Sequence, residues 1–474
     1  MNDKLPHCGI TVLPEYIQSE GIKAVLDNLE RLKCTAVTTS PYVAQEAADG
    51  QGAREPPEDA GLGTKRLLDR PLWSRRELWM TAAPSFVPNK ELYGDGPYQP
   101  DEASPLTHKE GPLIRQFLAA AKDRGLRTYL QVMAAIPPCY RVQFGNPTPE
   151  DLPLLPNGKP APIRVDRNAT LASSNLRAYL RGLIQDLINA YPECDGLRFD
   201  WPEYPPYHFL SLLTDYNPQV APVAEAMGID LSRLAEAVTK SCPDDMIRKA
   251  VQDDVSPGDA LAQLRQGNTA WNDHFRLRER LVQDFISFLR QEVDAANGAT
   301  KRLFVQGFPP PWDQLSGFAA GTVNGLADDV AIKFYTMHWP MIGANYTRYI
   351  SSFYEIPESQ ISAYFRRHFM GQREATNACG PLQYPSPEVP HAISAQAIAD
   401  KVSAFASADT IAIAHGYGPV KDVAERFEAA IDATGGFVEL NRYAYLSDAK
   451  IEALAKLLQD RYNQTDTVKC NQSN

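Results

Sequence analysis

The sequence predicts an α/β fold, a (β/α)₈ (TIM) barrel with long insertions after strands 2, 3, 4 and 6. Along its 474 residues, short apolar segments of strand length alternate strictly with longer segments of helical period. Eight such units indicate parallel strands that close into a barrel. The connections from a helix to the next strand are short, so the extra length follows the strands. A doubly wound sheet is the alternative, but no G-x-G-x-x-G or P-loop motif follows any of the strands.

The elements follow from two periodicities. Runs rich in β-branched, aromatic and other apolar residues predict strands at residues 9–13, 35–40, 127–133, 196–201, 302–308, 329–338, 410–416 and 436–442. Apolar residues spaced by three or four predict helices at residues 21–33, 112–126, 175–191, 274–297, 312–320, 393–406, 420–433 and 448–462. We expect residues 1–474 to form a single catalytic barrel, with a mostly helical insertion at about 205–270.

Composition excludes several classes of protein. Hydrophobic residues make up 44% and charged residues 22% of the chain, which is ordinary for a globular protein and excludes a disordered or fibrous one. The net charge of −11 argues against nucleic acid or an anionic membrane as partner. Seven cysteines without a C-x-x-C pair exclude a zinc ribbon or a thioredoxin-type site. With no apolar span of membrane length and no secretion signal, we expect a soluble, cytoplasmic protein.

The segment DGLRFDWPE, at the end of the fourth predicted strand, is the most informative one. Side chains alternate along a strand, so Arg198 and Asp200 share the face that points into the barrel, and Glu203 lies just beyond at the rim. An arginine two residues before an aspartate can orient that carboxylate. Carboxylates supply acid, base or nucleophile, and aromatic rings stack on sugars. The neighbouring aromatic candidates for substrate binding are Trp201 and Tyr204. Alternatively, Arg198 and Asp200 only neutralise each other.

DGLRFD resembles the D-G-x-R-x-D pattern of (β/α)₈ glycoside hydrolases, as found in the α-amylase-like enzymes. The resemblance implies that Asp200 is the nucleophile and that Arg198 orients it. These enzymes carry their acid/base glutamate at the fifth strand, where this chain has Gln306. A second clan places a glutamate acid after strand four and a glutamate nucleophile at strand seven. Glu203 fits the first role, but strand seven offers His415 and no carboxylate, so the resemblance reaches the superfamily and no specific family.

Glu439 is the only carboxylate inside the otherwise apolar eighth strand. Charged groups are rarely buried without a partner. Glu439 is therefore a member of the catalytic pair, a ligand for sugar hydroxyls, or an ion-pair partner of Arg198 or Lys333. Further candidates for contacts with the substrate lie at the ends of strands three, six, seven and eight: Gln131, Tyr335, His338, Trp339, His415, Asn441 and Arg442. Trp339 fits a loop anchor equally well, and a lone histidine such as His415 is more often structural. Tyr42 and Trp312 are weaker candidates.

These residues predict an enzyme that hydrolyses a glycosidic bond of a small glycoside or short oligosaccharide. Asp200 would be the nucleophile or base and Glu203 the general acid, with its pKa raised by the surrounding rings. Glu439 is the rival for either role. The expected partner is a small-molecule carbohydrate, with no cofactor and an oligomeric state that the sequence does not specify.

Three alternatives remain open at this point. A metal-dependent sugar isomerase, epimerase or lyase would use the same barrel, although no H-x-H, H-E-x-x-H or EF-hand spacing predicts a metal site. A non-catalytic sugar-binding barrel is consistent with the missing carboxylates at strands five and seven. The catalytic pair can also include an acid on an insertion, such as Glu102, Asp151 or Asp273.

Overall fold

The computed structural model describes residues 7–57, 66–162, 168–241, 244–297, 300–405 and 409–472. Eight parallel strands form a closed barrel in the order β1-β11-β10-β9-β8-β7-β6-β2, which confirms the predicted fold. The strands are β1 (His7–Thr11), β2 (Ala36–Thr39), β6 (Arg127–Met133), β7 (Gly196–Asp200), β8 (Arg302–Gly307), β9 (Asp329–Phe334), β10 (Ile411–His415) and β11 (Phe437–Asn441). Each lies within two residues of its predicted start.

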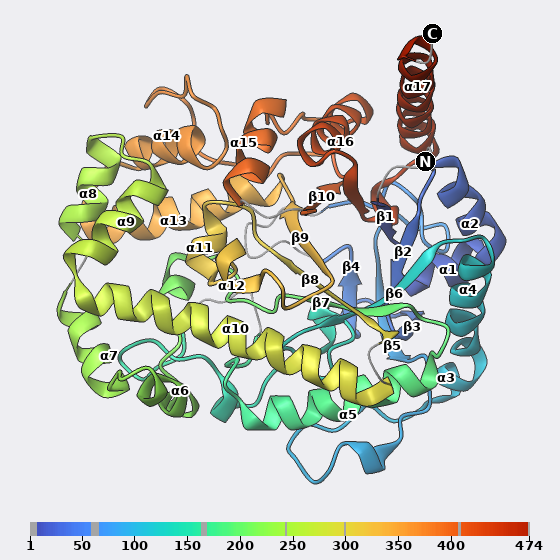
Figure 1. The fold of residues 1–474 in the computed structure, drawn as a ribbon, viewed down its shortest axis with the longest axis horizontal. Helices are drawn as coiled ribbons and strands as arrows, with labels where there is room; N and C mark the ends of the chain where they lie inside the picture. The colour runs from blue at the N-terminus through green and yellow to red at the C-terminus, as the bar shows by residue number, and fades with distance from the viewer. Residues whose placement is uncertain are drawn as a thin grey trace.

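Helices surround the barrel, as Figure 1 shows. The helices that match the predicted ones are α2 (Ile22–Arg31), α4 (Pro112–Asp123), α5 (Ser174–Ala190), α10 (Thr269–Asn297), α11 (Trp312–Ser316), α15 (Ala395–Phe405), α16 (Val420–Thr434) and α17 (Asp448–Gln472). The insertion after β7 carries α6 (Ala221–Ala226), α7 (Leu231–Lys240), α8 (Asp244–Gln252) and α9 (Pro257–Gly267). Further helices are α1 (Pro14–Glu20), α3 (Pro105–Glu110), α12 (Ala320–Val323), α13 (His338–Tyr354) and α14 (Glu358–His368).

The insertion after β2 contains a sheet that the sequence did not predict. Its three antiparallel strands, in the order β3-β5-β4, are β3 (Tyr42–Ala47), β4 (Ala53–Glu55) and β5 (Leu78–Pro84). Buried and partly or fully exposed residues mix along β3 and β5, and β4 has only three residues, so their apolar residues do not form the runs of the barrel strands. Their stability comes from pairing across long loops, which local sequence patterns do not report.

The sixth barrel strand is shorter than predicted. The prediction extended to residue 338, but β9 ends at Phe334, opposite Ala414 of β10. The aromatic residues that follow continue the apolar run without continuing the sheet. His338 and Trp339 therefore begin α13 instead of ending a strand, which corrects the predicted position of both.

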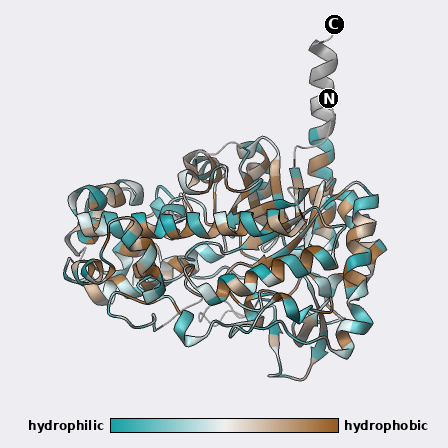
Figure 2. Ribbon diagram, turned by 60° about the horizontal axis from the view of Figure 1, so that its bottom comes forward, coloured by the Kyte–Doolittle hydropathy of each residue, from teal (hydrophilic) through white to brown (hydrophobic). Residues whose placement is uncertain are grey.

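Apolar side chains fill the layer between barrel and helices. Along many helices hydrophobic and hydrophilic residues alternate in patches, as Figure 2 shows, which is typical of helices with one face on a core. Inside the barrel, a small apolar layer includes Tyr129, Phe304, Ala331 and Ile413, and polar side chains lie above it. Among the described residues, no helix has the length and apolar character that crossing a membrane requires.

Candidate active site

The polar layer inside the barrel is built around Arg198. Its guanidinium forms an ion pair with Glu439 and donates to Gln306 Oε1, with an Nε–Oε1 distance of 3.0 Å. The other oxygen of Glu439 lies 3.0 Å from His7 Nε2. Arg198 and Glu439 are both fully buried. Gly9 leaves room for this layer, because a Cβ at Gly9 would lie 2.5 Å from Glu439 Oε1.

These contacts correct one expectation. Arg198 donates to Glu439, Gln306 and two threonine hydroxyls, and within the described part of the chain it makes no hydrogen bond to Asp200. It therefore does not orient that carboxylate. The geometry corresponds to the ion-pair interpretation of Glu439, since His7 and Arg198 occupy both of its oxygens. A catalytic role for Glu439 stays a prediction that this arrangement does not favour.

A tight turn carries Glu203 from the end of β7 back over the barrel. β7 ends at Asp200, and Trp201 adopts the left-handed backbone conformation with φ +57, which is uncommon for a residue other than glycine. The side-chain amide of Asn168 donates to the carbonyl oxygens of Trp201 and Glu203, both at 3.0 Å. Trp201 thus leaves the alternation of the strand, and Asn168 holds the turn in place.

Lys333 of β9 brings the two predicted acids together. Its Nζ lies 3.0 Å from Asp200 Oδ1 and 3.2 Å from Glu203 Oε1. Because both oxygens contact one nitrogen, they are no more than about 6 Å apart, which is below the ~6.5–9.5 Å separation of inverting glycosidases. Lys333 also lies over the ring of Phe308, 4.6 Å from its centroid. Lys333, and not Arg198, is therefore the cation that contacts both Asp200 and Glu203.

The two acids differ in their surroundings. The side chain of Asp200 is 13% exposed, whereas that of Glu203 is fully buried. Burial raises the pKa of Glu203 to about 7, although the Lys333 ammonium opposes the shift; the charge of Asp200 adds to it. Oε2 of Glu203 has no hydrogen-bond partner within the described residues. Glu203 can therefore hold a proton near neutral pH beside a carboxylate that reaches the mouth.

Aromatic rings form one wall of the barrel mouth. The ring of Trp201 packs edge-on against Tyr207, which in turn contacts His338. Tyr335 links His338 to His415, with ring centroids 5.8 Å and 5.2 Å away respectively. Tyr335 and His338 are partly exposed. Burial, followed by nearby cationic side chains and His338, lowers the pKa of His415 well below its usual value, so this ring is neutral.

Other predicted residues lie away from the pair. Tyr204 points toward Asp215 and lies under the guanidinium of Arg278, 4.3 Å from its ring centroid, so it is not part of the aromatic wall. Trp339 is buried in the core against Trp312, with centroids 5.5 Å apart. Neither tryptophan is available to stack on a sugar in this conformation. For Trp339 the loop-anchor interpretation fits.

An ionic wall faces the mouth from the other side. Arg442, directly after β11, forms an ion pair with the buried Glu55 of the small sheet. Arg141 binds the other oxygen of Glu55 and also Glu15, at 3.0 Å. Tyr42 donates to Glu15 at 2.8 Å, so its hydroxyl belongs to this network. Further predicted residues at strand ends, both partly exposed, are Gln131 and Asn441.

Sequence reasoning missed the positioning roles of two residues. Lys333 was considered only as a partner of Glu439, and Asn168 is part of an Asn-Ala-Thr triplet with no catalytic pattern. The lysine is detectable in principle as a charged residue inside an apolar strand. Nothing in the sequence near Asn168 signals its contact with the turn after β7.

The three candidate acids on the insertions contact other side chains. Glu102 pairs with Lys90 on the surface, and Asp273 pairs with Arg276. Asp151 is buried and accepts hydrogen bonds from several side chains, including Tyr98 and Ser173. Across the described ranges, no group of three or more His, Cys, Asp and Glu side chains is arranged to hold a metal ion.

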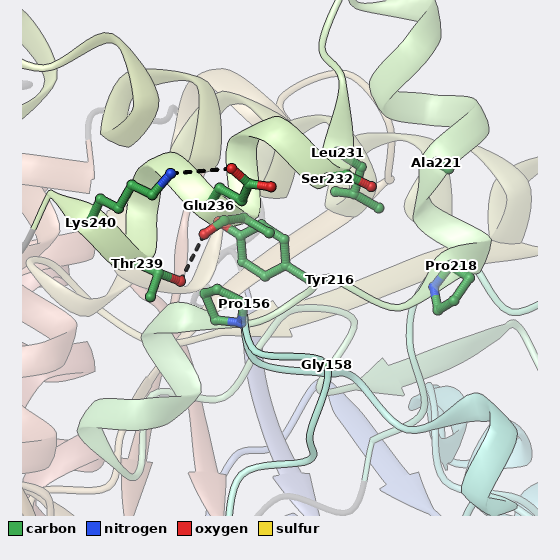
Figure 3. A pocket seen from close by; sticks show the side chains of 11 residues that line it. Pro156, Gly158, Tyr216, Pro218, Ala221, Leu231, Ser232, Glu236, Thr239 and Lys240 are labelled. Atoms are coloured by element: carbon green, nitrogen blue, oxygen red, sulfur yellow. Dashed lines mark hydrogen bonds and ion pairs between the residues drawn. The ribbon is translucent and has the colours of Figure 1, made fainter.

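A cavity of about 530 Å³ lies beside α7 (Figure 3), and none of the predicted site residues lines it. Its walls come from the loop around Pro156, the segment from Tyr216 to Ala221, and α7. The only charged side chains lining it are Glu236 and Lys240, which pair with each other at 3.2 Å. This cavity belongs to the insertions and adds no group to the carboxylate pair.

Comparison with known proteins finds similarity in structure only. No protein-family model and no curated protein matches the sequence. The catalytic domain of a β-amylase from Paenibacillus polymyxa is similar at a TM-score of 0.50 and 9% identity, covering 96% of this chain and 98% of that one. The shared property is the fold. At this identity the likeness shows a (β/α)₈ barrel and no more.

Two other solved structures have lower scores. A β-galactosidase from Marinomonas ef1 has a TM-score of 0.44 at 12% identity, covering 98% of this chain and 60% of that one. An α-L-fucosidase from Paenibacillus thiaminolyticus has a TM-score of 0.45 at 10% identity, covering 99% of this chain and 50% of that one. This chain therefore spans 60% of the length of the first protein and 50% of the second.

Proposed function

We propose that the protein is a glycoside hydrolase whose reacting groups are Asp200 and Glu203. The observation that carries the proposal is that Lys333 holds both carboxyl groups at the C-terminal end of a barrel strand, with distances of 3.0 and 3.2 Å. This is the face on which barrel enzymes place their active sites. The β-amylase domain that shares the fold is a carbohydrate-active enzyme by its name, which is consistent with the proposal.

The two acids take different roles. Asp200 is the exposed member, so it attacks the anomeric carbon as nucleophile in a retaining reaction, or deprotonates the attacking water as base in an inverting one. Glu203 supplies the proton to the leaving oxygen, since burial raises its pKa to about 7. The spacing of the two oxygens favours the retaining reaction. NMR of the first-formed anomer tests this directly.

The leaving group separates the two roles experimentally. In Glu203→Gln, hydrolysis of an alkyl glycoside should slow by about 10²–10⁴-fold, because its leaving oxygen needs a proton. A 2,4-dinitrophenyl glycoside should be affected much less, since its leaving group departs unprotonated. Asp200→Asn should be inactive on both substrates. Glu236→Gln, at an exposed glutamate on α7, is the control. Wild-type rates in both acid variants would refute the proposal.

A second candidate is a barrel that binds sugar without hydrolysing it. The ion pairs from Lys333 to both acids favour this alternative, because they satisfy the carboxylates without substrate. It predicts that monosaccharides raise the melting temperature in a saturable way while no glycoside is cleaved over long incubation. Turnover of any glycoside that Asp200→Asn abolishes would exclude it.

The proposed substrate class is a small glycoside or short oligosaccharide. The insertions after β2, β6, β7 and β9 follow the C-terminal ends of barrel strands, so they belong to the face that carries the pair. Long loops on this face would favour a short substrate over a polymer. Relative rates on 4-nitrophenyl monosaccharides and on a soluble polysaccharide test this part of the proposal.

A further inference from the structure

Arg442 is a guanidinium at the mouth of the barrel. It directly follows β11, so it lies on the same face as Asp200. Its guanidinium carbon is 5.3 Å from the ring centroid of Tyr445, and its side chain is 12% exposed. Burial has the largest effect on the pKa of Arg442 and lowers it, but Glu55 and Tyr445 raise it and the net shift is upward, so the side chain is positively charged.

The hydrogen bonds of Arg442 are incomplete. A guanidinium has five N–H donors. In the described part of the chain, Arg442 donates to Oε1 of Glu55 and to no other acceptor. Arg141 binds the second oxygen of Glu55, so this carboxylate is shared between two arginines. The remaining donors of Arg442 are therefore available to a ligand that reaches the mouth.

Tyr335 connects this arginine to the carboxylate pair. Burial raises the pKa of the Tyr335 phenol well above its usual value; the charge of Asp200 raises it further and that of Arg442 lowers it. Ring contacts run from Tyr335 through His415 to Tyr445, with centroids 5.2 and 5.1 Å apart, and the guanidinium of Arg442 lies over Tyr445. These rings give a sugar a surface to stack on beside Arg442.

We propose that the substrate is a uronic acid glycoside and that Arg442 binds its carboxylate. A planar guanidinium matches a carboxylate with two parallel hydrogen bonds, which a sugar hydroxyl cannot provide. A uronic acid carries this carboxylate on C5, within one ring of the anomeric carbon that Asp200 would attack. The inference rests on the proposed glycosidase function and specifies its substrate.

The test compares substrates that differ only at C6. The purified full-length enzyme is assayed with 4-nitrophenyl glucuronide and 4-nitrophenyl glucoside in both anomeric forms, and with the matching galacturonide and galactoside. The wild-type enzyme should have the higher kcat/KM on the uronide. In Arg442→Gln the ratio of uronide to neutral kcat/KM should fall by about 10- to 100-fold, mainly through KM. Arg442→Lys should show a smaller fall.

Arg70→Gln is a matched control. The side chain of Arg70 is 13% exposed, lies 4.7 Å from the ring centroid of Tyr443, and pairs with Glu20 and Asp448 outside the mouth. The uronide to neutral ratio should be unchanged in this variant. Circular dichroism and melting temperatures of all variants show whether they are folded.

The outcomes distinguish the two proposals. A wild-type preference for neutral glycosides, or a ratio that Arg442→Gln leaves unchanged in a folded protein, overturns the uronic acid inference and leaves the glycosidase standing. If no glycoside is cleaved, the proposed function fails. The subsite is then tested by calorimetry with free D-glucuronate and D-glucose. Binding of glucuronate alone, lost in Arg442→Gln, supports it, and equal or absent binding refutes it.

Discussion

Replacing Glu203 by glutamine should change how the stability of the protein depends on pH. The pKa of Glu203 is about 7 in the folded protein because of burial, against 4.5 for an ordinary glutamate. The folded state therefore binds this proton more tightly than the unfolded state. Between pH 4.5 and 7 a rise in pH removes the proton from the unfolded chain first, so the free energy of unfolding falls. Well above pH 7 Glu203 is ionised in both states, and the free energy of unfolding has fallen by its full amount.

The size of the effect follows from the two pKa values. A difference of about 2.5 corresponds to about 3 kcal/mol, since each pKa unit is ~1.4 kcal/mol. Most of this falls between pH 5 and pH 8. Glutamine cannot ionise, so Glu203→Gln does not lose this stability. Relative to wild type, the variant should gain roughly 2–3 kcal/mol of unfolding free energy from pH 5 to pH 8.

Urea unfolding of both proteins at pH 5, 6, 7 and 8 measures this difference. Effects of other titrating groups cancel when the variant is compared with wild type at each pH. Lys333 keeps its ion pair with Asp200 in the variant, so no unpaired ammonium is created. Glu236→Gln, at a side chain that is 71% exposed, should show no such dependence. A constant difference between Glu203→Gln and wild type across this range would refute the reasoning.

Three further predictions concern the site and its surroundings. The alkaline limb of the kcat/KM profile should lie near pH 7, where Glu203 loses its proton. Because the Lys333 ammonium lowers the pKa of Glu203, Lys333→Met should move this limb up by about 1–3 pH units. A limb that does not move would show that another group causes it. Glu439→Gln should lower the free energy of unfolding by ~3–5 kcal/mol, since it leaves the charge of Arg198 buried without its partner; a urea midpoint like that of wild type would contradict the ion pair. Trp339→Ala should lower the free energy of unfolding by ~3–5 kcal/mol and leave KM unchanged, because the Trp339 ring is packed in the core. A higher KM with unchanged stability would instead support the predicted contact of Trp339 with a sugar.

The barrel was predictable because its signals are local. Each barrel strand is a mostly apolar run, and the helices around the barrel have an apolar face, so both can be recognised in windows of a few residues. The small sheet of β3, β4 and β5 was missed since buried and exposed residues mix along β3 and β5 and β4 has only three residues. The end of β9 was overestimated because apolar residues continue past Phe334 into a turn. Only the neighbouring strands determine where pairing stops.

The position of the two candidate acids could also be predicted from the local sequence. Asp200 ends a barrel strand, and strand parity directs its side chain inward, so the sequence alone could place it at the mouth with Glu203 close behind. The distinction between them was partly predictable, since the aromatic surroundings of Glu203 suggested a raised pKa. The structure shows that burial is the main cause and that the charge of Asp200 adds to it.

The sequence by itself therefore determined the fold and the face and strand ends where polar side chains gather. The tertiary structure decided which charges meet. Arg198 pairs with Glu439, 241 residues away, and Lys333 reaches Asp200 across 133 residues. Several cations and carboxylates point into the same barrel, and any of them can pair by charge alone. Coulomb attraction does not select among them; the register and height of each strand in the closed barrel do, and these depend on every neighbouring strand at once.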